Sequence, residues 1–173
     1  MDIPAVEQMR AAGLELWGEI ELAYAFEQGK VLAVTGTNGK TTTTSLLGAI
    51  MEHAGLDVKV VGNIGVPYTS LVSGTTKDSV TVAEISSFQL ETVHEFCPQV
   101  SAILNITPDH LNRHHTMDNY RQAKERIAAN QGAGQFCILN YEDAALKEFS
   151  SKVNAQIVFF SSKRELGQGI YLD

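Results

Sequence analysis

The sequence predicts an α/β fold with a mostly parallel, doubly wound sheet and a phosphate-binding loop. First, short apolar runs rich in β-branched residues alternate with stretches of helical periodicity. Second, these runs are apolar on both faces, which is typical of parallel strands covered by helices on both sides. Third, the first run leads into "GTNGKTT" at 36–42 and then into a helical pattern. This strand–turn–helix order is what a phosphate-binding loop requires.

The predicted elements follow one another in the order that a parallel sheet needs. Strands are predicted, in chain order, at 30–35, 57–61, 79–85, 100–106, 135–139 and 156–160. Helical patterns at 41–54, 117–130 and 142–149 separate several of these strands. The connection 62–78 is predicted to be mostly loop, with one short helix, because it is rich in glycine and contains a proline.

The two ends of the chain differ from the middle. Residues 1–29 form a leading segment with two predicted short helices, "AVEQMRAAG", which Gly13 ends, and "GEIELAYAF". At the other end, "SSKRELGQGIYLD" breaks the alternation and stops without a closing element. This ending favours a domain that continues beyond the chain.

Composition sets limits on the function. The 173 residues are 44% hydrophobic and 19% charged, enough for one domain with a core, and the net charge is −7. The negative charge disfavours a nucleic-acid or anionic-membrane surface, while a local pocket for a phosphorylated small molecule remains allowed. No apolar run approaches the ~20 residues of a membrane helix, and no signal peptide is visible. Cys97 and Cys137 form no CxxC pair and are expected to be buried, reduced thiols. We therefore expect a cytoplasmic protein.

The glycine-containing loop departs from the general P-loop pattern G-x-x-x-x-G-K-[ST], because Val34 stands at the first glycine position. Two glycines still allow a tight turn with inward N–H groups, and a helix N-terminus favours an anion there. Lys40 supplies a positive charge and Thr41 a hydroxyl for Mg²⁺. The alternative is a glycine turn with a solvated lysine. The predicted phosphate-binding residues are Gly36, Thr37, Asn38, Gly39, Lys40, Thr41 and Thr42.

Glu84 is the candidate metal ligand beside this loop. It ends the apolar run "VTVAE", and the carboxyl ends of parallel strands are where ligands gather in open α/β sheets. A carboxylate there suits Mg²⁺ or an ordered water. The alternative is an ordinary surface glutamate at the end of a strand.

A cluster of polar residues, Asp109, His110, Arg113, His114 and His115, follows the next strand. His110 and His114 have the spacing of the zinc motif H-E-x-x-H, but the residue after His110 is leucine, so that motif is excluded. An Asp-His pair beside a triphosphate can position metal or substrate. We select His110 alone and expect the other histidines to include plain surface residues.

Lys124 falls on the buried side of a predicted helix. Tyr120, Ala123 and Ile127 mark the apolar stripe, and Lys124 is four residues after the first and three before the last. A lysine pressed into a core has a lowered pKa and a nucleophilic amine, which can add CO₂ to become a carbamate and a metal ligand. The alternative is snorkelling, with the ammonium in water, and periodicity alone favours it.

Taken together, these motifs resemble the central ATP-binding domain of the Mur ligases. The resemblance rests on "GTNGKTT", "GNIG" at 62–65, "EISSFQLE" at 84–91, and "PDHLNRH" followed by "NYRQAKERI". It runs from about residue 13 to about 140 and is strongest to the D-glutamate-adding members. "GEIELAYAF" also resembles the segment before their P-loop strand. One departure is Asn112, where aspartate is common in the family.

The resemblance implies an activity in cytoplasmic peptidoglycan synthesis, and hence in cell-wall formation and cell division. ATP would drive amide formation between UDP-N-acetylmuramoyl-L-alanine and D-glutamate through an acyl phosphate. Thr41 and Glu84 would hold one Mg²⁺. Glu84 and His110 would help to hold a second, supported by a carbamylated Lys124, and this role requires the Lys124 amine to lie on the buried face of its helix. The catalytic residues would be Lys40, Glu84, His110 and Lys124. The substrate side would be lined by Asn63, Ser86, Ser87 and Gln89.

The resemblance also implies missing parts. Residues 1–29 would be a leading segment from the interdomain region, and residues 30–173 an incomplete central domain without the family's N-terminal uridine-nucleotide domain and C-terminal domain. The chain alone is therefore expected to be inactive. Two alternatives remain open: another Mur ligase or folylpolyglutamate synthetase, and a non-catalytic nucleotide-binding module. Glu84, His110 and Lys124 together argue against the latter.

Overall fold

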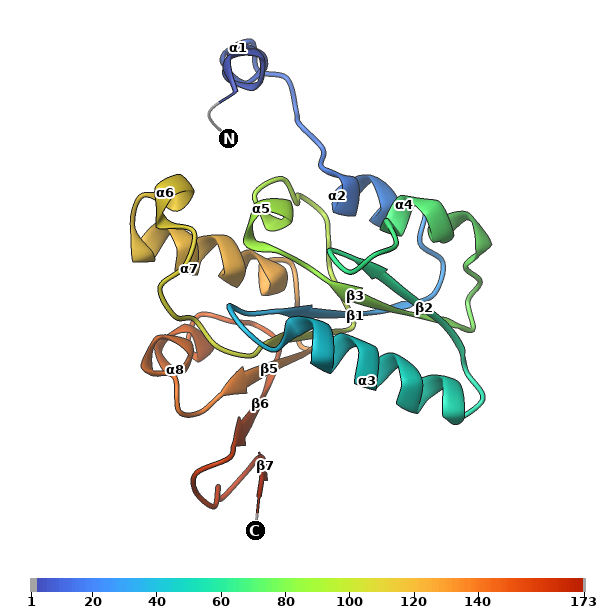
Figure 1. Ribbon diagram of the computed structural model, residues 1–173, viewed down its shortest axis with the longest axis vertical. Coiled ribbons are helices and arrows are strands. Elements are labelled where there is room, and N and C mark those ends of the chain that lie inside the picture. The colour runs from blue at the N-terminus through green and yellow to red at the C-terminus, as the bar shows by residue number, and fades with distance from the viewer. Residues whose placement is uncertain (1–2, 173) are drawn as a thin grey trace.

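A parallel sheet in the order β2-β3-β1-β4-β5-β6-β7 forms the frame of the molecule (Figure 1). The computed structural model describes residues 3–172, and every strand pair in this part of the chain is parallel. The six predicted strands are confirmed. The strands are β1 (Lys30–Thr35), β2 (Asp57–Gly62), β3 (Ser79–Glu84), β4 (Val100–Ile103), β5 (Phe136–Asn140), β6 (Gln156–Ser161) and β7 (Ile170–Tyr171).

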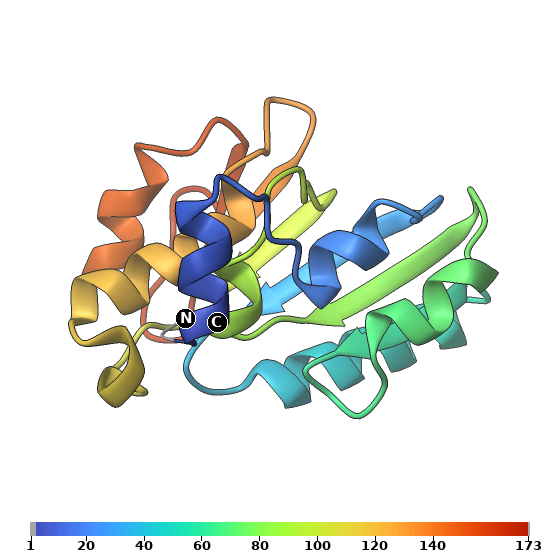
Figure 2. The same ribbon diagram turned by 90° about the horizontal axis from the view of Figure 1, so that it is seen from above.

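Helices lie on both sides of this sheet. The α-helices are α1 (Pro4–Ala11), α2 (Glu19–Tyr24), α3 (Lys40–His53), α4 (Tyr68–Leu71), α5 (Ser87–Leu90), α6 (Leu111–His114), α7 (Met117–Glu125) and α8 (Ala144–Ser150). Two 3₁₀ turns, η1 (Val72–Gly74) and η2 (Arg126–Ala128), continue α4 and α7. Helix α3 lies against one face of β1, β2 and β3, whereas α2, α4, α5 and α7 lie on the opposite side (Figures 1 and 2). No described helix combines the length and the apolar character that a membrane crossing requires.

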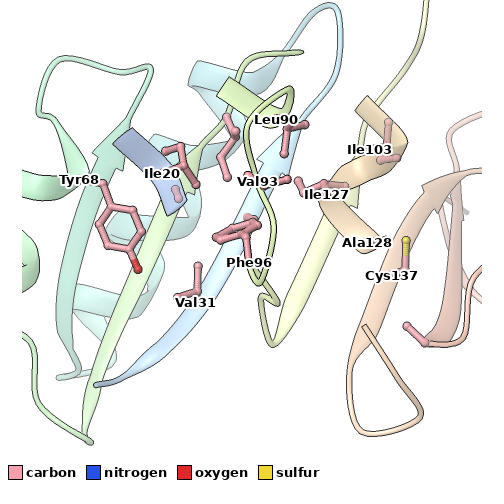
Figure 3. Packing of buried hydrophobic residues seen from close by; sticks show 14 of the residues in the cluster. Ile20, Val31, Tyr68, Leu90, Val93, Phe96, Ile103, Ile127, Ala128 and Cys137 are labelled. Atoms are coloured by element: carbon pink, nitrogen blue, oxygen red, sulfur yellow. The ribbon is translucent and has the colours of Figure 1, made fainter. Parts of the chain in front are cut away.

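The main core lies between the sheet and the helices opposite α3 (Figure 3). Ile20 of α2 and Tyr68 of α4 are fully buried there, and so is Ile127 after α7. Cys137 is buried as expected, but Cys97 is only half-buried. Burial of large apolar side chains of this kind stabilises a fold by about 1.5–3 kcal/mol each.

Part of the leading segment belongs to this core. In α2, Ile20 and Ala23 are fully buried, and the buried Glu21 carboxylate accepts hydrogen bonds from successive backbone N–H groups of 94–96 at 2.7–3.2 Å. Helix α1 buries no residue. The segment therefore has two parts, of which α2 is integral to the domain.

Helices cover the α3 side of the sheet unevenly. Beyond α3, an apolar cavity of about 500 Å³ lies against β1, β4, β5 and β6. It is lined by Leu46 and Ile50 of α3, by Ile138 of β5 and by Phe160 of β6, among others. The prediction of helices on both faces is thus confirmed for the part of the sheet formed by β2, β3 and β1, where α3 packs.

Several boundaries differ from the prediction. The strand expected to reach 106 ends at Ile103, and the helix expected to reach 130 tightens into η2 after Glu125. The helix expected from 142 begins at Ala144 because Asp143 caps it, accepting from the N–H groups of Ala145 and Leu146. The expectation of no closing element is wrong, since β7 pairs in parallel with β6.

Candidate functional site

The predicted phosphate loop follows β1, the strand from which the sheet extends in both directions. Strand β1 has β3 on one side and β4 on the other, so its carboxyl end is a topological switch point. The loop runs from there into α3, which begins at Lys40. Gly39 precedes the helix with φ of 84°, a left-handed conformation that favours glycine, and offers no side-chain cap. The first N–H groups of α3 therefore face a site suited to an anion.

Two lysines converge on this loop from different helices. Lys40 Nζ donates to the carbonyl oxygens of Gly36 and Thr37, both at 2.9 Å. Lys124 Nζ donates to the same Gly36 oxygen at 2.7 Å, and Thr35 Oγ1 lies 3.5 Å away. Lys124 is only 1% exposed, so its predicted burial is confirmed and the snorkelling alternative is wrong.

Burial changes the acidity of Lys124. The pKa of the Lys124 amine is lowered to about 7, mainly by burial and also by the nearby Lys40 charge, while Asp109 opposes the shift. The ring of Tyr120 lies beneath the amine, 4.8 Å from Nζ to the ring centroid. An amine with this pKa has a large neutral fraction near pH 7 and is a nucleophile there.

Glu84 connects the loop to a second segment. It lies beside Val34 in the sheet register, which confirms its predicted place next to the loop strand. One carboxylate oxygen accepts from the Thr41 hydroxyl and the other from the Asn63 amide, both at 2.8 Å. The Asn63 N–H also donates to the Glu84 carbonyl at 2.8 Å. The approach requires Gly62, because a Cβ at that position would lie 2.2 Å from the Glu84 carbonyl oxygen.

The residues around Glu84 fit a magnesium ion. Glu84 is 2% exposed, and within residues 3–172 no ion pair joins it to a cationic side chain. A buried carboxylate is costly unless a cation or hydrogen bonds compensate it. No group of three or more His, Cys, Asp or Glu side chains in the described part of the chain could hold a metal ion. Mg²⁺ commonly takes one or two protein oxygens, with phosphate and water completing the shell, so Thr41 and Glu84 suffice.

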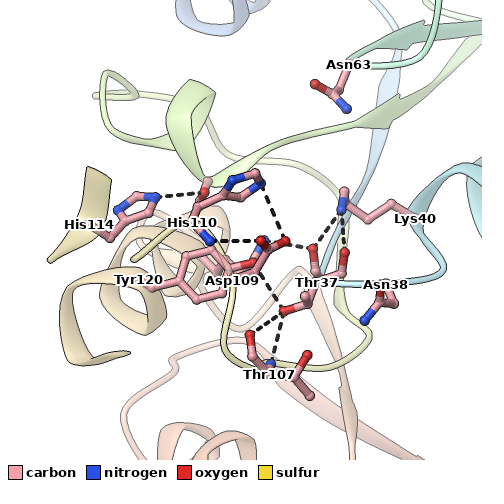
Figure 4. A network of polar contacts seen from close by, with 12 residues as sticks. Thr37, Asn38, Lys40, Asn63, Thr107, Asp109, His110, His114 and Tyr120 are labelled. Carbon is pink, nitrogen blue, oxygen red and sulfur yellow. Dashed lines mark hydrogen bonds and ion pairs between the residues drawn. The ribbon is translucent and has the colours of Figure 1, made fainter. Parts of the chain in front are cut away.

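Asn105 and Thr107 hold the loop in shape, and neither is among the site residues predicted from the sequence. Asn105 accepts from the Asn38 N–H at 2.9 Å and donates to the Asn38 carbonyl at 3.0 Å. Thr37 Oγ1 lies 3.1 Å from the Tyr120 hydroxyl and accepts from the Thr107 N–H at 3.0 Å (Figure 4). The position of Asn105 just after an apolar strand was the available signal.

His110 lies at the edge of the same region. Its φ of 50° is left-handed, it precedes α6, and its Nε2 lies 3.5 Å from Asp109 Oδ2. His110 lines a cavity of about 220 Å³ together with Lys40, Asn63, Ser86, Ser87, Phe88, Tyr120 and Lys124. The three histidines differ in burial. His115 is exposed, as expected for a surface residue, whereas His114 is only 5% exposed and is a core residue.

Two of the four candidates for the substrate side stabilise a helix start. Ser86 and Gln89 form a capping box at α5: the Ser86 hydroxyl accepts from the Gln89 N–H, and the Gln89 side chain accepts from the Ser86 N–H. Ser87 is buried, with its Oγ 3.0 Å from His114 Nε2. Asn63, Ser86 and Ser87 line the 220 Å³ cavity, while Gln89 is held by the box.

A parallel sheet with a glycine-containing loop, a lysine at the start of a helix and an adjacent buried carboxylate defines a phosphate-binding domain of the P-loop class. A more specific match follows from comparison with known families. The family model of the Mur ligase middle domain matches residues 34–170, and the chain belongs to the Mur ligase family.

Curated relatives agree with this membership. The UDP-N-acetylmuramoylalanine–D-glutamate ligases of Lachnoclostridium phytofermentans and Lachnospira eligens are each 57% identical to the chain, over 99% and 100% of its length. The chain spans only 38% of each relative.

Among solved structures, MurF ligase from Thermotoga maritima in complex with ADP superimposes with a TM-score of 0.65 at 20% identity. That match covers 84% of this chain and 36% of the other. E. coli FolC in complex with DHPP and ADP gives 0.61 at 15% identity, over 92% of this chain and 52% of the other. At these identities, the structural likeness establishes the fold.

Proposed function

We propose that this chain is the ATP-binding middle part of a D-glutamate-adding Mur ligase, an ATP-dependent acid–amino-acid ligase. The hydrogen bond between Glu84 and Thr41 carries the proposal, because it joins a buried carboxylate to the hydroxyl that follows the loop lysine. The names of the two relatives at 57% identity support D-glutamate as the amino acid. Because the chain spans 38% of their length, the complete reaction belongs to a longer protein.

The proposed reaction has two steps. A carboxylate oxygen of UDP-N-acetylmuramoyl-L-alanine attacks the γ-phosphorus of ATP, and the bond to the bridging oxygen breaks to release ADP. The amine of D-glutamate then attacks the carbonyl carbon of the acyl phosphate, loses a proton and expels inorganic phosphate. Phosphoryl transfer of this kind depends on positioning and charge neutralisation. The loop 36–39 and Lys40 would supply both to the phosphates.

Two observations support the proposed metal sites: Thr41 and Glu84 are hydrogen-bonded to each other, and His110 and Lys124 line the same cavity. Thr41 and Glu84 would hold one Mg²⁺, which when bound neutralises charge on the phosphates. Glu84 and His110, with Lys124 as a carbamate, would hold a second. The lowered pKa of Lys124 supports this role, because only the neutral amine adds CO₂. A ¹³C NMR spectrum with ¹³C-bicarbonate should show a carbamate signal that is lost in Lys124→Met and kept in Lys163→Met, a change at an exposed lysine.

The remaining proposed partners are small molecules. Asn63, Ser86, Ser87 and Gln89 would line the side of the uridine-muramoyl substrate, and three of them border the 220 Å³ cavity. We propose a cytoplasmic setting without nucleic-acid or membrane partners, in keeping with the net charge of −7.

A chimera tests the proposed specificity. This chain would replace the matching segment of the Lachnoclostridium phytofermentans ligase. ADP release would be measured with the muramoyl substrate and either D-glutamate, L-lysine or meso-diaminopimelate, and separately with a folate substrate and L-glutamate. We expect release that depends on D-glutamate and disappears in a Lys40→Ala chimera. The isolated chain should show no turnover.

Three outcomes would contradict the proposal. Release with another amino acid would assign the chain to a sibling ligase, and release with a folate substrate and L-glutamate to folylpolyglutamate synthetase. A correctly folded chimera that binds ATP without any turnover would favour a non-catalytic nucleotide-binding module.

A further inference from the structure

His114 is a buried imidazole that the proposed reaction does not use. Its ring stacks on Phe88, with centroids 5.2 Å apart and planes 9° apart, and its centroid is also 5.2 Å from that of Tyr120. The residue is only 5% exposed, and burial favours a neutral ring over a charged one. A neutral imidazole carries one proton, and the nitrogen that holds it decides what the other nitrogen can do.

The two ring nitrogens of His114 face different partners. Nδ1 lies 3.9 Å from Glu91 Oε1, while Nε2 lies 3.0 Å from Ser87 Oγ. Glu91 also pairs with Arg113, whose Nη2 is 3.3 Å from Oε2 and whose guanidinium lies over the Phe88 ring. A carboxylate facing Nδ1 favours the tautomer with the proton on that nitrogen. Nε2 is then an acceptor.

Because Nε2 is an acceptor, the Ser87 hydroxyl must be the donor in the hydrogen bond between them. The hydroxyl has a single proton, and donating it to His114 leaves only lone pairs for other partners. Ser87 also borders the 220 Å³ cavity that contains Lys40, Asn63 and Lys124. We propose that Glu91 and His114 position Ser87 as a hydrogen-bond acceptor for an N–H or O–H group of the ligand in this cavity.

The order carboxylate, histidine, serine also occurs in hydrolytic triads. Ser87 is only 2% exposed, and its role here is hydrogen bonding rather than nucleophilic attack. The separation of 3.9 Å between Glu91 and His114 exceeds a hydrogen bond, so the carboxylate acts through its field. The identity of the ligand rests on the proposed function: UDP-N-acetylmuramoyl-L-alanine carries amide and hydroxyl donors.

The tautomer of His114 tests the positioning without any ligand. Long-range ¹H–¹⁵N spectra of the chain distinguish a protonated ring nitrogen from an acceptor nitrogen. We expect the proton on Nδ1 in the wild type and a reduced preference in Glu91→Gln. A proton on Nε2 would overturn the proposal, because His114 would then donate to Ser87.

Binding tests what the positioned hydroxyl does. In the chimera described above, the affinity for UDP-N-acetylmuramoyl-L-alanine should fall about 3- to 10-fold in Ser87→Ala, the loss expected for one uncharged hydrogen bond. His114→Phe keeps a stacked ring but removes the acceptor, and should weaken binding similarly. His114→Gln restores an acceptor and should bind nearly as the wild type does. Melting temperatures would show that each variant is folded.

The double variant Ser87→Ala with His114→Phe should lose no more than either change alone, because His114 acts through Ser87. Additive losses, or unchanged affinity in Ser87→Ala, would overturn the proposal. If the wild-type chimera does not bind the muramoyl substrate, the proposed function is wrong. The tautomer of His114, measured without any ligand, then still shows whether Ser87 donates to His114 or accepts from it.

Discussion

Lys40 and Lys124 donate to the same acceptor, the carbonyl oxygen of Gly36, at 2.9 and 2.7 Å. Lys40 is the first residue of α3, the helix that follows the loop, whereas Lys124 is on α7, on the opposite side of the sheet. Burial is the main cause that lowers the pKa of Lys124 to about 7, and the positive charge of Lys40 nearby adds to this shift. The loop thus receives one lysine from each side of the sheet, and the buried Lys124 can be neutral near pH 7.

The lowered pKa of Lys124 predicts how stability depends on pH. Between the folded pKa of about 7 and the ordinary value of 10.5, the unfolded chain binds more protons at this residue than the folded chain does. The contribution of Lys124 to the free energy of unfolding therefore rises with pH across that window, by up to about 1.4 kcal/mol per pH unit. In urea unfolding without CO₂, Lys124→Met should be stabilised relative to wild type at pH 7, with the difference shrinking by pH 9.

Lys163→Met, at an exposed site, is the matched control and should show no such trend. A stability difference between Lys124→Met and wild type that stays constant from pH 7 to 9 would contradict the assigned pKa.

Glu84→Gln should weaken the magnesium-dependent part of ATP binding. The amide keeps the size of the side chain and can still accept from Thr41, but it removes the negative charge that would attract the cation. We expect the affinity for ATP with Mg²⁺ to fall about 10-fold or more, and the affinity for ATP in EDTA to change little. Glu165→Gln, at an exposed site, is the control. Equal losses with and without Mg²⁺ would assign Glu84 a structural role only.

Asn105→Ala should loosen the phosphate loop. The change removes both hydrogen bonds to the Asn38 backbone, each worth about 1 kcal/mol. Hydrogen exchange at the Asn38 amide should accelerate at least several-fold, without a comparable change in the strands. Asn154→Ala, at an exposed site, should leave that rate unchanged. Unchanged exchange in Asn105→Ala would show that the loop keeps its shape by other contacts.

Glu21→Ala should destabilise the whole domain. The buried carboxylate accepts from three backbone N–H groups, and its removal leaves them without this partner. We expect a loss of about 3 kcal/mol in the free energy of unfolding, measured with denaturant. Glu7→Ala, on α1, should change it by less than about 0.5 kcal/mol. A neutral Glu21→Ala would mean that α2 is not part of the cooperative unit.

These contacts show which features a single sequence can predict. The places of Lys124 and Glu84 followed from local rules: the first lies four residues after Tyr120 on a helix, and the second ends a strand next to the loop strand. The capping box of Ser86 and Gln89 also has a local signature, S-x-x-Q, at the start of α5.

Other contacts depend on how the chain folds back. Ser87 and His114 are 27 residues apart, and Asn38 and Asn105 are 67 apart, so no local periodicity relates them. The two residues of β7 are too few to form a pattern, and their pairing with β6 depends on the edge of the sheet being available. Packing between distant segments determines all three.

Isothermal titration calorimetry of this chain with Mg-ATP tests the central claim most directly. Wild type should bind, and Lys40→Ala should bind about 10- to 100-fold more weakly, since hydrogen bonds to charged groups contribute about 1.5–3 kcal/mol. Lys163→Ala, far from the loop in sequence and exposed, should bind as the wild type does. Equal binding heats and affinities for wild type and Lys40→Ala, with both proteins folded, would contradict the assignment of residues 36–42 as the phosphate-binding loop.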